Sequence, residues 1–248
     1  MPKIILVYNY KGGVGKSIIS YNLAAGLAQV GPKVLLANVD GQNNSVNVFA
    51  KTEVSTSIYD LLQTPRLTID QIKIPLTNNL DGLNSKNLTD INIELTEKRD
   101  RLNECFDYMF PKEELKEYDY FIFDCGPQEV MINAMLLINA NGIIMPVSAD
   151  FEGVEATQNT FAYLDYLGLD RDLIKLVVPN MVSNSTGSKI ALKTIETLFN
   201  KRIMTMPIPR RVAINYAATC GTSIYEYTQE QMIIDPFINL LEKTMEVF

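Results

Sequence analysis

The sequence predicts an open α/β fold, with a mainly parallel, twisted β-sheet and helices on both of its faces. Along the 248 residues, short apolar runs rich in β-branched residues alternate with longer segments of helical periodicity. This alternation is typical of parallel strands joined by crossover helices, because the helices bury both faces of the sheet. A glycine-rich turn also separates the first apolar run from the first helical segment.

Strand-like and helical segments can be assigned along the whole chain. A helix is expected over 17–30, where Gly31-Pro32 ends it, and a charged, solvated amphipathic helix over 86–116. The residues from 237 to the end are expected to form a last helix packed on the sheet. Without a linker or an internal repeat, residues 1–248 are predicted to form a single domain. The runs predicted to be strands are 4–8, 33–39, 80–83, 120–123, 142–146, 173–178 and 203–206.

Composition excludes several classes of protein. Hydrophobic residues make up 47% of the chain, enough for a sizeable core, but no apolar run approaches the length that spans a bilayer or forms a signal peptide. A cytoplasmic protein is therefore expected. The 3 cysteines, Cys105, Cys125 and Cys220, are far apart, and the chain has no histidine. Zinc sites, iron–sulfur sites within one chain and histidine-based catalytic triads are poor candidates.

The glycine-rich turn has the sequence of a phosphate-binding loop. Its end, Gly15-Lys16-Ser17, follows a strand and opens a helix, as a P-loop requires. Backbone N–H groups from Gly12 to Ile18 can approach a phosphate closely where no Cβ intervenes, and the helix dipole adds positive potential. Lys16 is expected to reach the β- and γ-phosphates and Ser17 to coordinate Mg²⁺. The cofactors predicted are ATP and Mg²⁺, and the nucleotide-binding residues of this loop are Gly12, Gly13, Val14, Gly15, Lys16, Ser17 and Ile18.

The start of the loop departs from the usual P-loop. Tyr10 occupies the position of the first glycine, and Lys11 follows it. The loop as a whole resembles the deviant Walker A motif of the ParA/MinD family of P-loop ATPases. The resemblance implies a P-loop NTPase fold and a nucleotide-sandwich homodimer that forms with ATP, in which Lys11 contacts the ATP of the partner subunit.

Two further acidic positions resemble motifs of that family. The segment Asn38-Val39-Asp40-Gly41-Gln42 is similar to the family's Asp-x-Asp-Pro-Gln switch, which implies that Asp40 orients the attacking water near the metal. Asn38 and Gly41 replace the first aspartate and the proline, so a more flexible loop and slower or less tightly coupled hydrolysis are expected. Asp124 follows four apolar residues, the pattern of a Walker B strand whose acid holds Mg²⁺. The alternative is a strand-end aspartate that caps the next helix. The residues expected to act in catalysis are Lys11, Lys16 and Asp40, and the metal ligands Ser17, Asp40 and Asp124.

The resemblance extends to the nucleotide base and the dimer interface. Residues 146–153 are similar to the family's interface segment, and Asn180 ends a strand where the family often has an adenine-binding asparagine. Asn180 could equally be a turn residue. Pro207, Pro209 and Arg210 match the family's loop beside the base.

Basic residues are concentrated in one stretch of an otherwise acidic chain. Residues 1–170 carry 13 Lys and Arg against 22 Asp and Glu, whereas residues 171–211 carry 8 against 2. A two-fold dimer would double this basic surface, which favours nonspecific binding to DNA phosphates. A solvated basic face that balances the acidic half is the alternative. The predicted DNA-binding residues are Lys189, Lys193, Lys201 and Arg202.

The resemblance is closest to the small ParA-type partition ATPases without an N-terminal helix-turn-helix, because the first strand begins near residue 4. It implies plasmid or chromosome partition, a ParB-like centromere-binding partner that stimulates hydrolysis, and association with the nucleoid when ATP is bound. The alternative is a MinD- or McdA-like positioning ATPase for a membrane-associated or protein cargo. Residues 237–248 contain one lysine and two glutamates, so no stable membrane anchor is expected. Iron-protein and arsenite-pump relatives would need clustered cysteines, which the chain lacks.

Overall fold

The sheet lies at the centre of the computed structural model, which describes residues 1–41, 45–50, 57–86, 88–127 and 130–248. In these residues the strands form a 7-stranded sheet of order β3-β4-β2-β5-β1-β6-β7. Neighbouring strands run parallel, and the edge strand β3 pairs antiparallel with β4. The predicted mainly parallel sheet is confirmed. The strands are β1 (Lys3–Val7), β2 (Val34–Val39), β3 (Ile74–Thr77), β4 (Leu80–Leu83), β5 (Tyr120–Cys125), β6 (Gly142–Ser148) and β7 (Ile174–Asn180).

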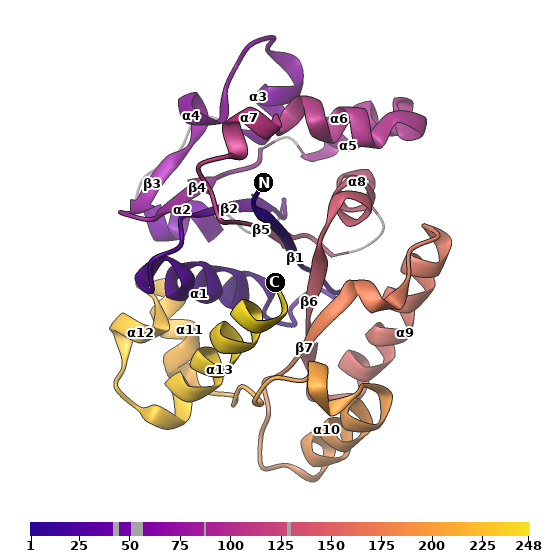
Figure 1. Ribbon diagram of the computed structural model, residues 1–248. Coiled ribbons are helices and arrows are strands. Elements are labelled where there is room, and N and C mark those ends of the chain that lie inside the picture. Colours follow the sequence, from indigo (N-terminus) through magenta and orange to yellow (C-terminus); the bar gives the residue numbers. More distant parts are fainter. Residues whose placement is uncertain (42–44, 51–56, 87, 128–129) are drawn as a thin grey trace.

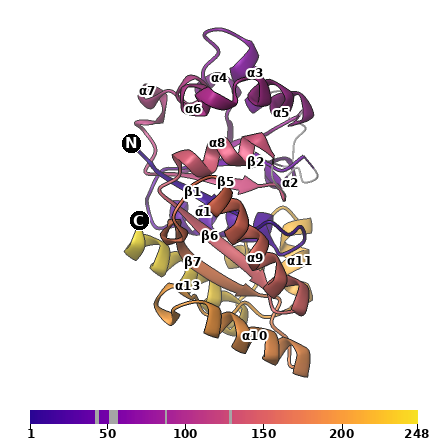
Figure 2. The ribbon, with the colours of Figure 1, turned by 90° about the vertical axis from the view of Figure 1, so that its right-hand side faces the viewer.

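Helices cover both faces of the sheet, as predicted (Figure 1, Figure 2). Two groups of buried apolar side chains separate the faces. One group takes residues from α1, α2 and α11 to α13, and the other takes residues from α3 to α10. The helices are α1 (Lys16–Gln29), α2 (Ser45–Ala50), α3 (Ile58–Gln63), α4 (Ile69–Ile72), α5 (Leu88–Glu97), α6 (Leu102–Met109), α7 (Lys112–Leu115), α8 (Met131–Asn139), α9 (Phe151–Tyr166), α10 (Thr186–Leu198), α11 (Val212–Thr219), α12 (Ile224–Tyr227) and α13 (Gln231–Val247), with short 3₁₀ turns at Arg99–Arg101, Arg171–Leu173 and Lys201–Ile203.

The central strands are buried along their whole length, because helices pack on both sides of them. Every residue of β2 and β6 is buried, and so is every residue of β5 except Tyr120. Phe110 packs edge-on against Phe121 and Phe123 of β5, with ring centroids 5.2 and 5.6 Å apart. Polar side chains that could perform chemistry are therefore confined to the ends of these strands.

The strand order determines which strand ends meet. β5, which comes late in the chain, lies between β1 and β2. Asp124 on β5 is in register with Val7 on β1 and with Asn38 on β2. Since parallel strands end at the same edge, the P-loop after β1, the switch segment after β2 and the acid at the end of β5 lie next to one another.

Two predicted elements differ from the structure. Residues 203–206 do not form a strand: Met204 makes an isolated bridge to Val177, and only the Thr205 N–H, which donates to the Val177 carbonyl at 2.9 Å, extends the contact. Pro207 and Pro209 lack the N–H that a continuing strand needs. The single helix expected over 86–116 is broken into α5, α6 and α7, whose buried leucines and aromatic residues pack on the sheet.

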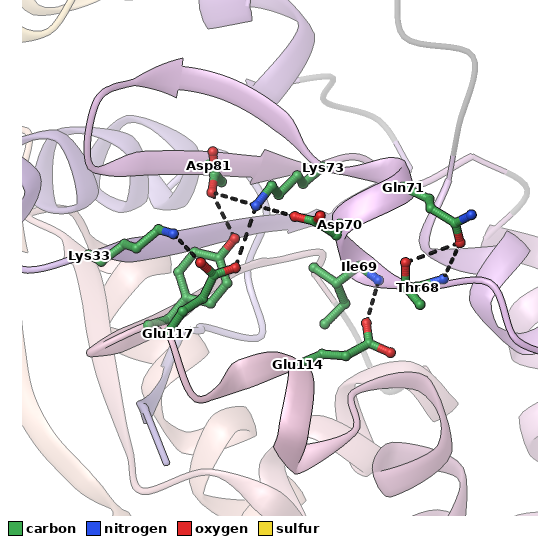
Figure 3. A network of polar contacts seen from close by, with 10 residues as sticks. Lys33, Thr68, Ile69, Asp70, Gln71, Lys73, Asp81, Glu114 and Glu117 are labelled. Atoms are coloured by element: carbon green, nitrogen blue, oxygen red, sulfur yellow. Dashed lines mark hydrogen bonds and ion pairs between the residues drawn. The ribbon is translucent and has the colours of Figure 1, made fainter.

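A network of charged side chains lies at the opposite end of the parallel strands from the P-loop, where β2, β4 and β5 begin (Figure 3). The buried Tyr118 hydroxyl donates to Asp81 at 2.7 Å. Lys73 lies within ion-pair distance of Asp70, Asp81 and Glu117, and Glu117 also pairs with Lys33. The network joins the antiparallel hairpin of β3 and β4 to the start of β5.

The last helix, α13, packs on the sheet as predicted. Ile233, Phe237 and Leu240 are buried against the α1 side of the core. Among the helices in the described residues, none has the length and apolar character needed to cross a bilayer.

Candidate nucleotide-binding site

The backbone of the P-loop adopts conformations that favour glycine. Gly13 and Gly15 adopt left-handed conformations, with φ of 73° and 94°. Gly15 is the N-cap of α1, so the unpaired N–H groups of the first helical turn face the loop. A Cβ on Gly15 would lie 2.2 Å from Nδ2 of Asn180, whereas nothing lies within 4 Å of a Cβ on Gly13.

Lys16 is folded back over the loop. Its side chain is buried, and its Nζ donates to the carbonyl oxygens of Lys11 at 2.8 Å and Asn9 at 3.3 Å. Burial lowers the pKa of the Lys16 ammonium, and the nearby carboxylates of Asp124 and Asp40 oppose that shift. A cation held by main-chain carbonyls at the mouth of a P-loop can pair with an anionic phosphate that enters it.

The residues predicted to hold Mg²⁺ lie beside Lys16. Asp124 is fully buried and accepts a hydrogen bond from the Ser20 hydroxyl of α1 at 3.4 Å. Asp40, 7% exposed, is close enough for its charge to act on Lys16, and Ser17 lies in the first turn of α1. Two carboxylates and a hydroxyl form the oxygen donor set that Mg²⁺ prefers. The residues of this site therefore fit a Mg²⁺–nucleotide.

The switch segment begins on β2, and a side chain of that strand holds its backbone. The Asp40 N–H donates to Oδ1 of Asn38 at 3.0 Å. A Cβ on Gly41 would lie 3.0 Å from the side chain of Leu88, which would have to shift by a few tenths of an ångström. Gln42, the last residue of the predicted motif, lies outside the described residues.

Lys11 is held by two acidic residues of its own chain. Its Nζ lies 3.4 Å from Oδ1 of Asp150 and 2.9 Å from Oε2 of Glu152. Asp150 also caps α9 through the Gly153 N–H at 2.7 Å. Although burial raises it, the pKa of Asp150 is below its usual value because Gly153, Ser148 and Lys11 stabilise the carboxylate. The contact of Lys11 with a partner's ATP stays a prediction.

The residues predicted for the base lie together, at the end of β7. Asn180 donates from Nδ2 to the Val14 carbonyl at 2.8 Å, so it contacts the P-loop itself. The loop that contains Pro207 and Pro209 is hydrogen-bonded to the same strand end: the Ile208 N–H donates to the Pro179 carbonyl at 2.8 Å. Arg210 is exposed and lines an open cavity with Met181 and Asp150. The contact of these residues with adenine stays a prediction.

Asn9 is a residue of the candidate site that the sequence reasoning missed. It is fully buried, its Nδ2 donates to the Pro146 carbonyl at 2.7 Å, and its Oδ1 accepts from the Lys11 N–H at 2.9 Å. It thereby joins the start of the P-loop to β6. A polar residue directly after an apolar strand and before the glycine-rich turn was the available signal.

The predicted DNA-binding residues lie on a different element from the nucleotide site. Lys189 and Lys193 are exposed on α10, and Lys201 is exposed in the 3₁₀ turn that follows. In the described part of the chain, no ion pair involves these three lysines. The side chain of Arg202 lies outside the part that is described.

Fold and site together define a P-loop nucleotide-binding protein. Residues 2–169 match the model of a protein family described as an AAA domain. The sporulation initiation inhibitor protein Soj of Bacillus subtilis is 29% identical over 254 residues, which cover 98% of each chain. The chromosome partitioning protein ParA of Myxococcus xanthus is 25% identical, over 98% of this chain and 88% of that protein. The chain belongs to the ParA/MinD family of P-loop ATPases.

A solved structure shares the whole fold. A plasmid partition protein of Borrelia burgdorferi bound to AMPPNP has a TM-score of 0.81 at 24% identity, with 100% of both chains covered. The match confirms the predicted P-loop NTPase fold. Because the identity is low, this likeness concerns the fold alone.

Proposed function

We propose that the chain is one P-loop domain over residues 1–248 that binds and hydrolyses ATP with Mg²⁺. The observation that carries this proposal is the buried Lys16 ammonium, held over the P-loop between main-chain carbonyls and next to Asp124 and Asp40. Membership of a family of P-loop ATPases supports it. The N–H groups of the loop and Lys16 would bind the phosphates, and Ser17 and Asp124 would hold Mg²⁺. Asp40 would orient the attacking water.

Calorimetry tests nucleotide binding. Lys16→Ala should weaken ATP binding at least about tenfold in the presence of Mg²⁺, because a charge-assisted contact to phosphate is lost. Lys189→Ala, which removes the same charge from the exposed face of α10, is the matched control and should leave ATP affinity unchanged. Unchanged affinity in Lys16→Ala would contradict the assignment of the site.

In the full proposal, ATP drives formation of a sandwich homodimer that binds nonspecific DNA, and a ParB-like partner stimulates hydrolysis. This cycle would move a plasmid or a chromosome in the cytoplasm, with the ATP-bound form on the nucleoid. The relatives support it, since Soj and ParA each match the chain over nearly its whole length. Lys11 would leave Asp150 and Glu152 and contact the partner's ATP.

The DNA surface proposed is α10 with the turn after it. Lys189, Lys193 and Lys201 are exposed and form no ion pair with acids in the described residues, so their charges are available to phosphates. If six or more phosphates are contacted in the dimer, affinity should fall about 10³-fold between 50 and 200 mM salt.

Fluorescence anisotropy on a labelled random duplex tests this surface. Binding should require ATP, and alanine at Lys189, Lys193, Lys201 and Arg202 together should remove most of it while ATP affinity stays the same. A second quadruple variant, with alanine at Lys3, Lys86, Arg99 and Lys112, changes the net charge equally at exposed positions outside the basic stretch and should bind DNA as the parent does. If the two variants behave alike, the DNA surface is wrong, and a positioning ATPase for a protein cargo becomes the better proposal.

A further inference from the structure

Asn84, Asn38 and Asp124 form a row of polar side chains across neighbouring strands, beside the residues proposed to hold Mg²⁺. Ala37 of β2 pairs with Leu83 of β4, so the residues that follow them, Asn38 and Asn84, lie side by side. Asn38 is also in register with Asp124 of β5. In chain order these residues are distant, and only the strand order β4-β2-β5 brings them together.

The row faces helix α1. Leu36 and Ile122, two positions earlier on β2 and β5, belong to the core on the α1 side, and side chains two apart on a strand share a face. The Ser20 hydroxyl of α1 contacts Asp124 on that face. Asn38 and Asp124 are both 0% exposed. Their polar groups must therefore find partners inside the protein.

The backbone of Asp40 determines how the two amides of the row are oriented. The Asp40 N–H can only donate, so the Asn38 side chain presents its oxygen to it, at 3.0 Å. The amide nitrogen of Asn38 then points the other way and donates to Oδ1 of Asn84, at 3.4 Å. Asn84 thus acts as an acceptor for Asn38, and Asn38 acts as an acceptor for the backbone of the switch segment.

This orientation leaves a donor of Asn84 without a partner. Asn84 is 2% exposed, and its Nδ2 has no hydrogen-bond partner among the described residues. An unpaired buried donor is unfavourable. Asn84 therefore accepts from Asn38 while its own amide N–H groups make no hydrogen bond in the described residues. An aspartate at position 38 would let Asn84 turn its amide and donate, but it would place a carboxylate in register with Asp124, where like charges repel.

We infer that Asn38 and Asn84 form a positioning pair, in which Asn84 orients the Asn38 amide and Asn38 holds the Asp40 backbone, so that the Asp40 carboxylate is placed for ATP hydrolysis. The pair acts through Asp40 and contacts neither nucleotide nor metal. This inference rests on the proposed ATPase function. It predicts that the pair contributes to turnover and not to ATP binding.

Asn84→Leu removes the acceptor and keeps the branching and the number of non-hydrogen atoms of the side chain. Turnover at saturating ATP and Mg²⁺ should fall at least about tenfold, because misplacing a catalytic group by 1 Å can cost about 10²-fold. ATP affinity by calorimetry should match that of the parent. Ser85→Ala is the matched control: its hydroxyl is the next buried polar group in the chain and has no hydrogen-bond partner in the described residues, so both turnover and ATP affinity should be unchanged.

Substitutions at Asn38 test the same pair without altering Asn84. Asn38→Asp keeps an oxygen for the Asp40 N–H, and Asn84 can turn to donate to it, so this variant should keep more turnover than Asn38→Leu despite the charge it places in register with Asp124. Asn38→Leu offers no acceptor and should lose turnover as Asn84→Leu does, with ATP affinity retained. These two variants test the positioning pair even if Asn84→Leu does not fold.

The outcomes separate this inference from the proposed function. Parental turnover in folded Asn84→Leu or Asn38→Leu overturns the positioning pair, and so does an equal loss of ATP affinity, which would indicate a structural role. A parent protein that neither binds nor hydrolyses ATP would contradict the proposed function itself.

Discussion

Gly15→Ala is the substitution whose effect can be worked out most directly from the structure. The residue would have to keep a φ of 94° with a Cβ, which costs an L-residue about 1–2 kcal/mol. That Cβ would also lie 2.2 Å from Nδ2 of Asn180. Asn180 can move away only by giving up its hydrogen bond to the Val14 carbonyl, a further cost of about 1–3 kcal/mol for buried groups left unpaired. The free energy of unfolding should fall by about 2–5 kcal/mol in all.

Gly13→Ala separates the two contributions. Gly13 also has a positive φ, 73°, but a Cβ there meets nothing within 4 Å. It should therefore cost only the backbone strain, about 1–2 kcal/mol. Urea denaturation of the nucleotide-free protein, followed by circular dichroism, measures both variants. Adding Asn180→Ala should relieve the clash, so the double variant Gly15→Ala/Asn180→Ala should be more stable than the sum of the two single effects predicts. Equal destabilisation by Gly13→Ala and Gly15→Ala would refute the contact between the P-loop and β7.

Three further predictions concern the switch, the charged network and the core. Asp40→Ala should still bind ATP but accumulate as a dimer, because binding contacts survive while water positioning is lost; light scattering that shows only monomer with ATP would contradict this. Tyr118→Phe should lower the free energy of unfolding by about 1–3 kcal/mol, because the buried Asp81 carboxylate loses the hydrogen bond from the Tyr118 hydroxyl, whereas Tyr166→Phe, at an 81% exposed position, should change it little. Phe110→Ala should cost about 3–5 kcal/mol by leaving a cavity beside Phe121 and Phe123, in contrast to Tyr108→Ala, which changes a residue of α6 that is 51% exposed. Urea denaturation that gave equal values for Phe110→Ala and Tyr108→Ala would contradict the described core.

The sequence alone was sufficient for the features that depend on neighbouring residues. The glycines, Lys16 and Ser17 form a local loop whose function follows from backbone geometry, so both the P-loop and its place between a strand and a helix could be predicted. Periodicity gave the buried strands to within a few residues, since a strand covered on both faces must be apolar throughout. Residues 203–206 show the limit of that argument: the run is apolar, but its backbone makes a single bridge and two prolines follow.

Tertiary structure decided which distant residues meet. Nothing local to β5 indicates that it lies between β1 and β2, yet this order places Asp124 beside both the P-loop and Asn38. The contact of Asn180 with the base stays a prediction, and the strand end on which this residue lies brings its amide to the Val14 carbonyl. The pairing of Lys11 with Asp150 and Glu152, and of Asn38 with Asn84, likewise depends on the order of strands in the sheet. Strand order is fixed by the packing of the whole core, which no short stretch of sequence contains.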